Sequence, residues 1–149
     1  MSGSVSGTVY VGGVVGVQIG GSITGCSSSA TVKGTVDVGG VAGQTNSNAP
    51  MTACYATGNV TSTGSSTVNV YIGGFCGYNS TTVTACYWKN NQEQGIGYKK
   101  VGTAPEATKV DGTDVTWQKA VDAMNTALQN AGSKWRYELN GTLPTLRKL

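Results

Sequence analysis

The sequence predicts a mainly β protein: a parallel β-solenoid of about three coils, followed by a C-terminal helix and β-hairpin that cap it. Three observations predict this fold class. A glycine-centred block recurs in the N-terminal part, that part is dominated by Val, Thr, Ser and Gly, and helical periodicity is confined to the C-terminal part. We therefore expect two domains, glycine-rich repeats over residues 1–88 and a cap over residues 89–149.

The repeat has two blocks that always follow one another in the same order. The first, with two adjacent glycines and a third three residues later, occupies residues 10–16, 37–43 and 71–77. The second, an apolar residue, Thr, a small residue and Cys, occupies residues 23–26, 51–54 and 83–86. The glycine blocks start 27 and 34 residues apart. A repeat of this length predicts stacked β-units, because no single copy has enough apolar surface to fold alone. Helical repeats are disfavoured, because these residue types are poor helix formers.

Alternation within the first strand of each coil predicts which side chains face the core. The inward set is Val9, Val11, Gly13, Val15; Val36, Val38, Gly40, Ala42; and Val70, Ile72, Gly74, Cys76. Two outward columns follow, one of Tyr10, Asp37 and Tyr71 and one of Val14, Val41 and Phe75, unless a glycine bulge switches the alternation. Because the second column is apolar, we expect another element to cover it.

The sequence of the C-terminal part predicts a helix that covers this apolar column. Apolar residues spaced three and four apart predict an amphipathic helix over residues 115–131, with Asp114 or Thr116 as N-cap, and Trp117, Val121, Met124 and Leu128 facing the Val14, Val41, Phe75 column. Residues 135–139 alternate, Asn140-Gly141 predicts a two-residue turn, and Pro144 predicts an edge strand. Residues 89–113 show no clear periodicity and predict a connecting loop with at most one short strand.

Four cysteines and the absence of histidine narrow the chemistry. Cys26, Cys54 and Cys86 occupy equivalent repeat positions, about one strand spacing apart, where stacked free thiols are favoured over a disulfide. No metal pattern is present, so neither a metal nor a cofactor is expected. Asp111 and Asp114 are interpreted as helix-capping residues rather than calcium ligands.

These repeats resemble the GLUG motif, a glycine-rich repeat of bacterial surface proteins, adhesins and some immunoglobulin-cleaving peptidases. The matching features are the Val-Gly-Gly-Val-x-Gly block, the Thr-x-Cys-Tyr block and residues 56–60, Ala-Thr-Gly-Asn-Val. The resemblance covers residues 1–88 as repeats, and the segment from Trp135 to Leu146 is similar to the ends of such proteins in gut Bacteroidetes. It implies a bacterial cell-surface protein without assigning an activity to any residue.

Several function classes are excluded by composition. A chain without histidine has no Ser/His/Asp or Cys/His arrangement, and the repeats hold one carboxylate, Asp37, so we expect no enzyme. Of the 17 charged residues, 15 lie from Lys89 onward and form no basic stripe, which argues against nucleic-acid binding. No run is long and apolar enough to span a membrane, and the first residues do not read as a signal peptide, so any export signal is expected outside this sequence.

The repeats thus predict a non-catalytic, surface-exposed module for adhesion or for protein or glycan interaction. Tyr10, Asp37 and Tyr71 are the candidate partner-binding face, with ordinary cross-strand aromatic packing as the alternative. Two other functions stay open: a carbohydrate-binding or carbohydrate-processing β-helix, by analogy of fold alone, and a structural spacer of a larger surface protein or peptidase. We expect an extracellular or cell-surface location, a host protein or glycan as partner, and further repeats of the same parent chain at the N-terminal end.

Overall fold

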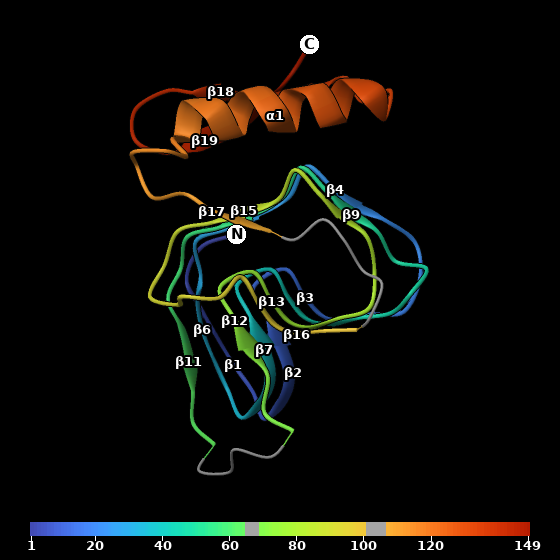
Figure 1. Ribbon diagram of the computed structural model, residues 1–149, viewed down its shortest axis with the longest axis vertical. Coiled ribbons are helices and arrows are strands. Elements are labelled where there is room, and N and C mark those ends of the chain that lie inside the picture. The colour runs from blue at the N-terminus through green and yellow to red at the C-terminus, as the bar shows by residue number, and fades with distance from the viewer. Residues whose placement is uncertain (65–68, 101–106) are drawn as a thin grey trace.

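The computed structural model describes residues 1–64, 69–100 and 107–149 and is mainly β with one α-helix. Short strands recur in the same order (Figure 1), and each passage through them is called a coil here. Coil 1 holds β1 (Ser4–Ser6), β2 (Val9–Gly12), β3 (Val15–Gln18), β4 (Ile23–Thr24) and β5 (Ser27–Ser28). Coil 2 holds β6 (Thr31–Gly34), β7 (Val36–Gly39), β8 (Ala42–Thr45), β9 (Met51–Thr52) and β10 (Tyr55–Ala56). Coil 3 holds β11 (Val60–Ser62), β12 (Ile72–Gly73), β13 (Cys76–Asn79), β14 (Val83–Thr84) and β15 (Tyr87–Trp88).

Equivalent strands of successive coils pair in parallel and form five stacked sheets. They are sheet A (β1, β6, β11), sheet B (β2, β7, β12), sheet C (β3, β8, β13, β16), sheet D (β4, β9, β14) and sheet E (β5, β10, β15, β17). Val11, Val38 and Ile72 lie in one register, as predicted. The arrangement is consistent with a parallel β-solenoid, because each strand pairs with the strand one repeat away.

Two strands continue the stack beyond Trp88. β16 (Ile96–Lys99) pairs with β13, and β17 (Thr108–Lys109) pairs with β15, so the segment predicted as a loop carries a part of a fourth coil. The spacing between β13 and β16 is shorter than the earlier repeat spacing, which is why the pattern was hidden in the sequence.

The interior has two lobes. Val11, Val32, Val38 and Val60 fill the space between sheets A and B. The larger cluster, within sheets C, D and E, includes Val41, Ala42, Met51, Cys54, Phe75, Cys76, Val83 and Cys86. Val9, predicted to face the core, is 48% exposed. The reason is backbone geometry, because Tyr10 has φ 55° and breaks the strict alternation of an extended strand.

The predicted outward column Val14, Val41 and Phe75 faces inward instead. Val41 and Phe75 are fully buried in the larger cluster, and Val14 packs against it. The glycine pair before each of these residues switches the in-and-out alternation of side chains, as the sequence allowed for a glycine bulge. The prediction that this column receives the helix is therefore wrong.

Helix α1 (Trp117–Asn130) packs on sheet E rather than on the Val41 column. Its buried residues are Trp117, Ala120, Val121, Met124 and Leu128, which confirms the predicted face. They meet Ala53, Tyr55, Tyr87 and Val110 of coils 2 to 4. Thr116 is the N-cap, its side chain accepting a hydrogen bond from the Lys119 N–H, and Gly132 (φ 70°) follows the last turn.

The C-terminal hairpin, β18 (Trp135–Leu139) and β19 (Pro144–Lys148), lies behind α1 in Figure 1. Leu139 pairs with Pro144, so the turn has the four residues 140–143 instead of the predicted Asn140-Gly141 pair. Leu143, within the turn, packs on the helix cluster, which favours the longer connection. The Tyr137 hydroxyl donates to the Ala53 carbonyl oxygen, fixing the hairpin to coil 2.

Helix and hairpin thus cover the side of the stack, as Figure 1 shows, rather than its end. Residues 88–92 cover the part of the coil 3 end that lies over sheet A and the glycine block, and β16 and β17 continue sheets C and E there. The Asn91 side chain accepts a hydrogen bond from the Val60 N–H and donates one to the Val60 carbonyl, and Asn90 donates to the Gly74 carbonyl. The Trp88 indole lies against Gly74 and Gly95 and donates to the Gln92 carbonyl.

Candidate functional site

The structure places the predicted face Tyr10, Asp37 and Tyr71 in one column of sheet B. Tyr10 and Asp37 lie between the paired residues of β2 and β7, and Tyr71 precedes Ile72, which pairs with Val38. Their exposure differs, because Tyr10 is 42% exposed, Tyr71 is half-buried and Asp37 is buried. The three residues therefore share a column without forming one accessible face.

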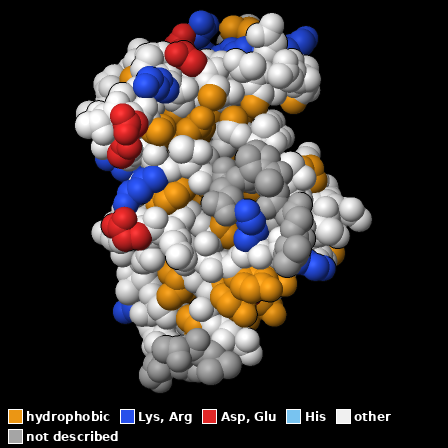
Figure 2. All heavy atoms as spheres, viewed as in Figure 1, with side chains coloured by type: hydrophobic (Ala, Val, Ile, Leu, Met, Phe, Trp, Pro, Cys, Tyr) orange, Lys and Arg blue, Asp and Glu red, His pale blue; other side chains and the backbone are white. Residues whose placement is uncertain are grey.

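Tyr71 instead belongs to an aromatic group with Tyr78 and Tyr98, called the tyrosine patch here. The Tyr71 ring lies 5.7 Å from the Tyr78 ring and 4.8 Å from the Tyr98 ring. Tyr78 and Tyr98 are 4.9 Å apart and stacked, with 20° between their planes. Figure 2 shows apolar and aromatic side chains gathered at this place, over β16 and beside sheet B.

Strand register and glycine together position the tyrosine patch. Tyr78 of β13 pairs directly with Tyr98 of β16, which stacks their rings on the outer face of sheet C. Sheet B reaches them because Gly77 and Gly97 lie against its backbone, where any Cβ would clash. The two sheets therefore approach closely enough for Tyr71 to complete the group.

Asp37 is the buried acidic group of this region. The residue as a whole is 5% exposed, and its Oδ1 atom is buried with no hydrogen-bond partner among the described residues. Burial raises the pKa of Asp37 to about 6, because the charged form loses hydration. Asp37 also has φ 49°, the left-handed conformation that Tyr10 adopts one coil earlier. A buried carboxylate of this kind is poorly placed to contact a partner.

Sequence reasoning missed Tyr98. The signal was present, because Ile96-Gly97-Tyr98 repeats the pattern of Cys76-Gly77-Tyr78 and pairs with it strand for strand. Tyr55 and Tyr87, which share the repeat positions after cysteine, are buried under α1 and the hairpin and lie in the packing interface.

The four cysteines are free thiols. Cys54 and Cys86 stack closely enough that the Cys86 sulfur accepts a hydrogen bond from the Cys54 N–H at 3.4 Å. Burial raises the pKa of the Cys76 thiol, and hydrogen bonding and burial raise that of Cys26. Such thiols stay protonated, so they are poor nucleophiles.

The other candidate ligands lie apart. Asp111 Oδ1 accepts hydrogen bonds from the Thr113 and Val115 N–H groups, which lower its pKa and make it a turn residue ahead of α1. Asp114 is not the N-cap, since Thr116 has that role. Within residues 1–64, 69–100 and 107–149, no three Cys, Asp or Glu side chains are grouped so as to hold a metal ion. In the same ranges no helix has the length and apolar character needed to cross a bilayer.

Comparison with known proteins gives one result. Residues 4–33 match the GLUG motif, and this span runs from β1 through nearly all of β6, one full coil and the start of the next. Searches of curated proteins and of solved structures found no match to the chain. The match supports the GLUG repeat in coil 1, and strand register extends the same winding to coils 2 and 3.

Proposed function

We propose that this chain is a non-catalytic, extracellular or cell-surface module that binds a host protein or glycan through the tyrosine patch. The observation that carries the proposal is the patch itself, three tyrosine rings from two neighbouring sheets within 6 Å of one another on the side of the stack. Tyr98 remains 39% exposed in this packing.

Several features support this reading. Tyrosine presents a large, rigid ring and a hydroxyl at low conformational cost, which suits both sugar stacking and protein contact. Coils 1 to 3 carry two charged residues, Lys33 and Asp37, whereas two lysines, Lys99 and Lys100, directly follow Tyr98 in the sequence. The GLUG motif in residues 4–33 favours a surface module.

The test is a binding screen with a glycan array and a panel of extracellular host proteins. We expect the full chain to bind at least one ligand, and we expect Tyr98→Ala to weaken that binding by about tenfold or more, because stacking and burial at one aromatic anchor are lost. Trp135→Ala is the matched control, since Trp135 is an exposed aromatic residue of the hairpin, away from sheets B and C. Equal loss in both variants contradicts the proposal.

Two alternatives are outcomes of the same screen. Hydrolysis or elimination of a polysaccharide by the purified chain would identify a carbohydrate-processing β-helix, although Asp37, the carboxylate of coils 1 to 3, is buried. Absence of binding to every glycan and protein would favour a structural spacer within a larger surface protein or peptidase.

A further inference from the structure

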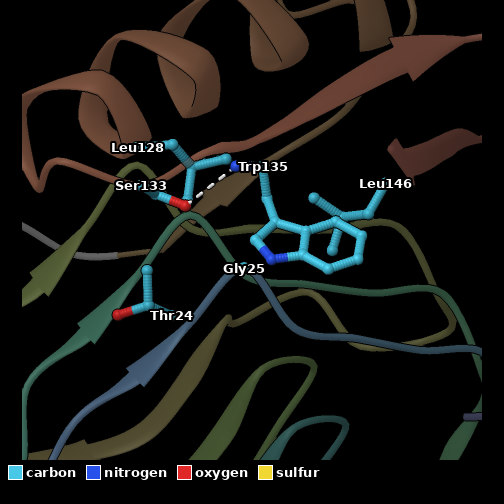
Figure 3. Close-up of a pocket in the computed structure, with 6 residues that line it drawn as sticks. All are labelled: Thr24, Gly25, Leu128, Ser133, Trp135 and Leu146. Atoms are coloured by element: carbon cyan, nitrogen blue, oxygen red, sulfur yellow. Dashed lines mark hydrogen bonds between the residues drawn. The ribbon is translucent and has the colours of Figure 1, made fainter. Parts of the chain in front are cut away.

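A pocket of about 230 Å³ lies in the seam between coil 1 and the C-terminal helix and hairpin. It is lined by Thr24, Gly25, Leu128, Ser133, Trp135 and Leu146. Figure 3 shows the Trp135 indole and Leu146 beside the backbone at Gly25. A Cβ at Gly25 would point into this seam, 3.5 Å from Leu128 and 3.8 Å from Leu146. Coils 2 and 3 have Ala53 and Ala85 at this place, so coil 1 leaves more room under the hairpin than they do.

The walls of the pocket combine an exposed indole with apolar and hydroxyl side chains. Trp135 is 47% exposed, Leu128 is fully buried and Leu146 is half-buried. Thr24 is exposed, and the Ser133 hydroxyl oxygen accepts a hydrogen bond from the Trp135 N–H. A sugar ring has an apolar face of C–H groups and a rim of hydroxyls. An aromatic wall with a few polar groups at its edge therefore suits a ligand of one ring.

A cationic side chain lies directly beside the indole. Tyr137 faces coil 2, because its hydroxyl donates to the Ala53 carbonyl, and Trp135 lies two residues earlier on the same side of β18. Lys148 is the residue opposite Trp135 in the hairpin, so both side chains lie on one face. Arg136 adds a second cation, since its Nη1 donates to the Ser133 and Trp135 carbonyls.

The open end of the hairpin carries an excess of positive charge. Its basic residues are Lys134, Arg136, Arg147 and Lys148. The acidic groups of the hairpin are the Glu138 side chain, which forms an ion pair with Arg147, and the carboxylate of Leu149. Such an excess attracts an anionic ligand. A carboxylate adds little bulk to a sugar ring, which suits a pocket of this volume next to Lys148.

We propose that this seam binds one residue of a uronic-acid glycan, with the sugar ring against Trp135 and its carboxylate beside Lys148. The site lies on coil 1 and the hairpin, whereas the tyrosine patch lies on sheets B and C, so the two sites are independent. A ligand of this seam loses affinity in Trp135→Ala and keeps it in Tyr98→Ala. A ligand of the tyrosine patch does the reverse.

The test is isothermal titration calorimetry of the full chain with a short oligomer of galacturonic acid. The matched neutral oligomer of galactose differs from it by lacking the carboxylates. We expect the acidic oligomer to bind about fivefold more tightly than the neutral one at low ionic strength, and we expect added salt to narrow this difference, because exposed charges are screened.

Four variants locate the site. Trp135→Ala should weaken binding of the acidic oligomer by about tenfold or more, whereas Trp135→Phe, which keeps a ring, should retain most of it. Lys148→Gln should weaken it by about threefold and reduce the preference over the neutral oligomer, as expected for one exposed charge. Lys33→Gln removes an equally exposed lysine from sheet A and should change nothing.

Several outcomes would overturn the proposal. They are no binding of the acidic oligomer, equal binding of the neutral oligomer, and a loss in Lys33→Gln that matches the loss in Lys148→Gln. Equal binding of a polyglutamate peptide or of a sulfated glycan would also overturn it, because charge alone would then explain the affinity.

Discussion

The two ends of the stack are built from the same repeat but finished differently. At the C-terminal end, the Asn91 side chain bonds both backbone groups of Val60, and Trp88 lies over the glycine block of coil 3. At the N-terminal end, Val5 and Ile23 are half-buried and the strand edges are unpaired apart from the contact of Met1. The difference teaches that side-chain amides and one indole can finish sheet A and the glycine block of coil 3, while the strands β16 and β17 continue sheets C and E by backbone pairing.

The helix and hairpin have another role. Because α1 packs across Tyr55, Tyr87 and Val110, it ties coils 2, 3 and 4 together from the side. Asn125 reinforces this by bonding both backbone groups of Tyr137 in the hairpin. The stack is thus held laterally by the C-terminal segment, while the end is closed by a short stretch that the sequence presents as a featureless loop.

Replacing the buried Trp88 and the half-exposed Trp135 of the hairpin should give the largest contrast. Trp88→Ala is expected to cost about 3–5 kcal/mol in the free energy of unfolding, because the buried indole leaves a cavity over Gly74 and Gly95. Trp135→Ala, at the half-exposed hairpin position, should cost about 1 kcal/mol or less. Urea denaturation of both variants measures this, and equal losses would refute the closed-end interpretation.

Valine occupies the same position of sheet A at both ends and in the middle of the stack, so the same substitution can be compared at all three places. Val5, Val32 and Val60 pair in sheet A, and the last two are at 0% exposure. Val32→Ala and Val60→Ala should each cost about 2 kcal/mol, and Val5→Ala less than half of that, because less apolar surface is lost at the open end. A cost at Val5 matching that at Val32 would show that the N-terminal end is already covered.

Removing the side-chain amide cap should have a smaller effect. Asn91→Ala leaves the Val60 N–H and carbonyl without the Asn91 partner and is expected to cost about 1–2 kcal/mol, as lost hydrogen bonds at partly buried groups do. Asn46→Ala, an exposed asparagine in a turn of coil 2, is the control and should change stability by less than about 0.5 kcal/mol. The free energy of unfolding of both variants is measured by chemical denaturation. Equal losses in the two variants would contradict the role of Asn91 in covering Val60.

Asp37, in the middle coil, should make the stability of the protein depend on pH, an effect that we do not expect from the residues at either end. Folding raises the pKa of Asp37 from an ordinary value of 3.8 to about 6, so the folded state binds a proton that the unfolded chain has released. Stability from this group is greatest below pH 4 and falls as the pH rises toward about 6. Asp37→Asn should flatten that part of the profile in urea denaturation at several pH values. An unchanged slope would exclude Asp37 as its cause.

Much of the fold followed from the sequence, because repetition reports register directly. The double glycines aligned Val11, Val38 and Ile72, and apolar spacing gave the buried face of α1. Which side chains of each strand face the core was harder to predict. Left-handed backbone at Tyr10 and Asp37 breaks alternation, and this conformation is uncommon enough in such residues that period two was the natural expectation.

The candidate site was predictable in part. Tyr71 was identified, but Asp37 of the same column is buried and Tyr98 was missed, because β16 returns to sheet C after a shortened spacing. The docking mode of the helix was also out of reach. It depends on Tyr55 and Tyr87 facing outward from sheet E, which local periodicity over two-residue strands does not specify.

Amide hydrogen exchange of the unmodified chain, resolved by residue, tests the central claim most directly. Both the Val60 and the Thr24 N–H groups point away from coil 2, toward opposite ends of the stack. We predict that Val60 is protected by at least about a hundredfold more than Thr24, because a buried hydrogen-bonded amide exchanges only after local opening. Equal protection of the two amides would contradict the account of one closed and one open end.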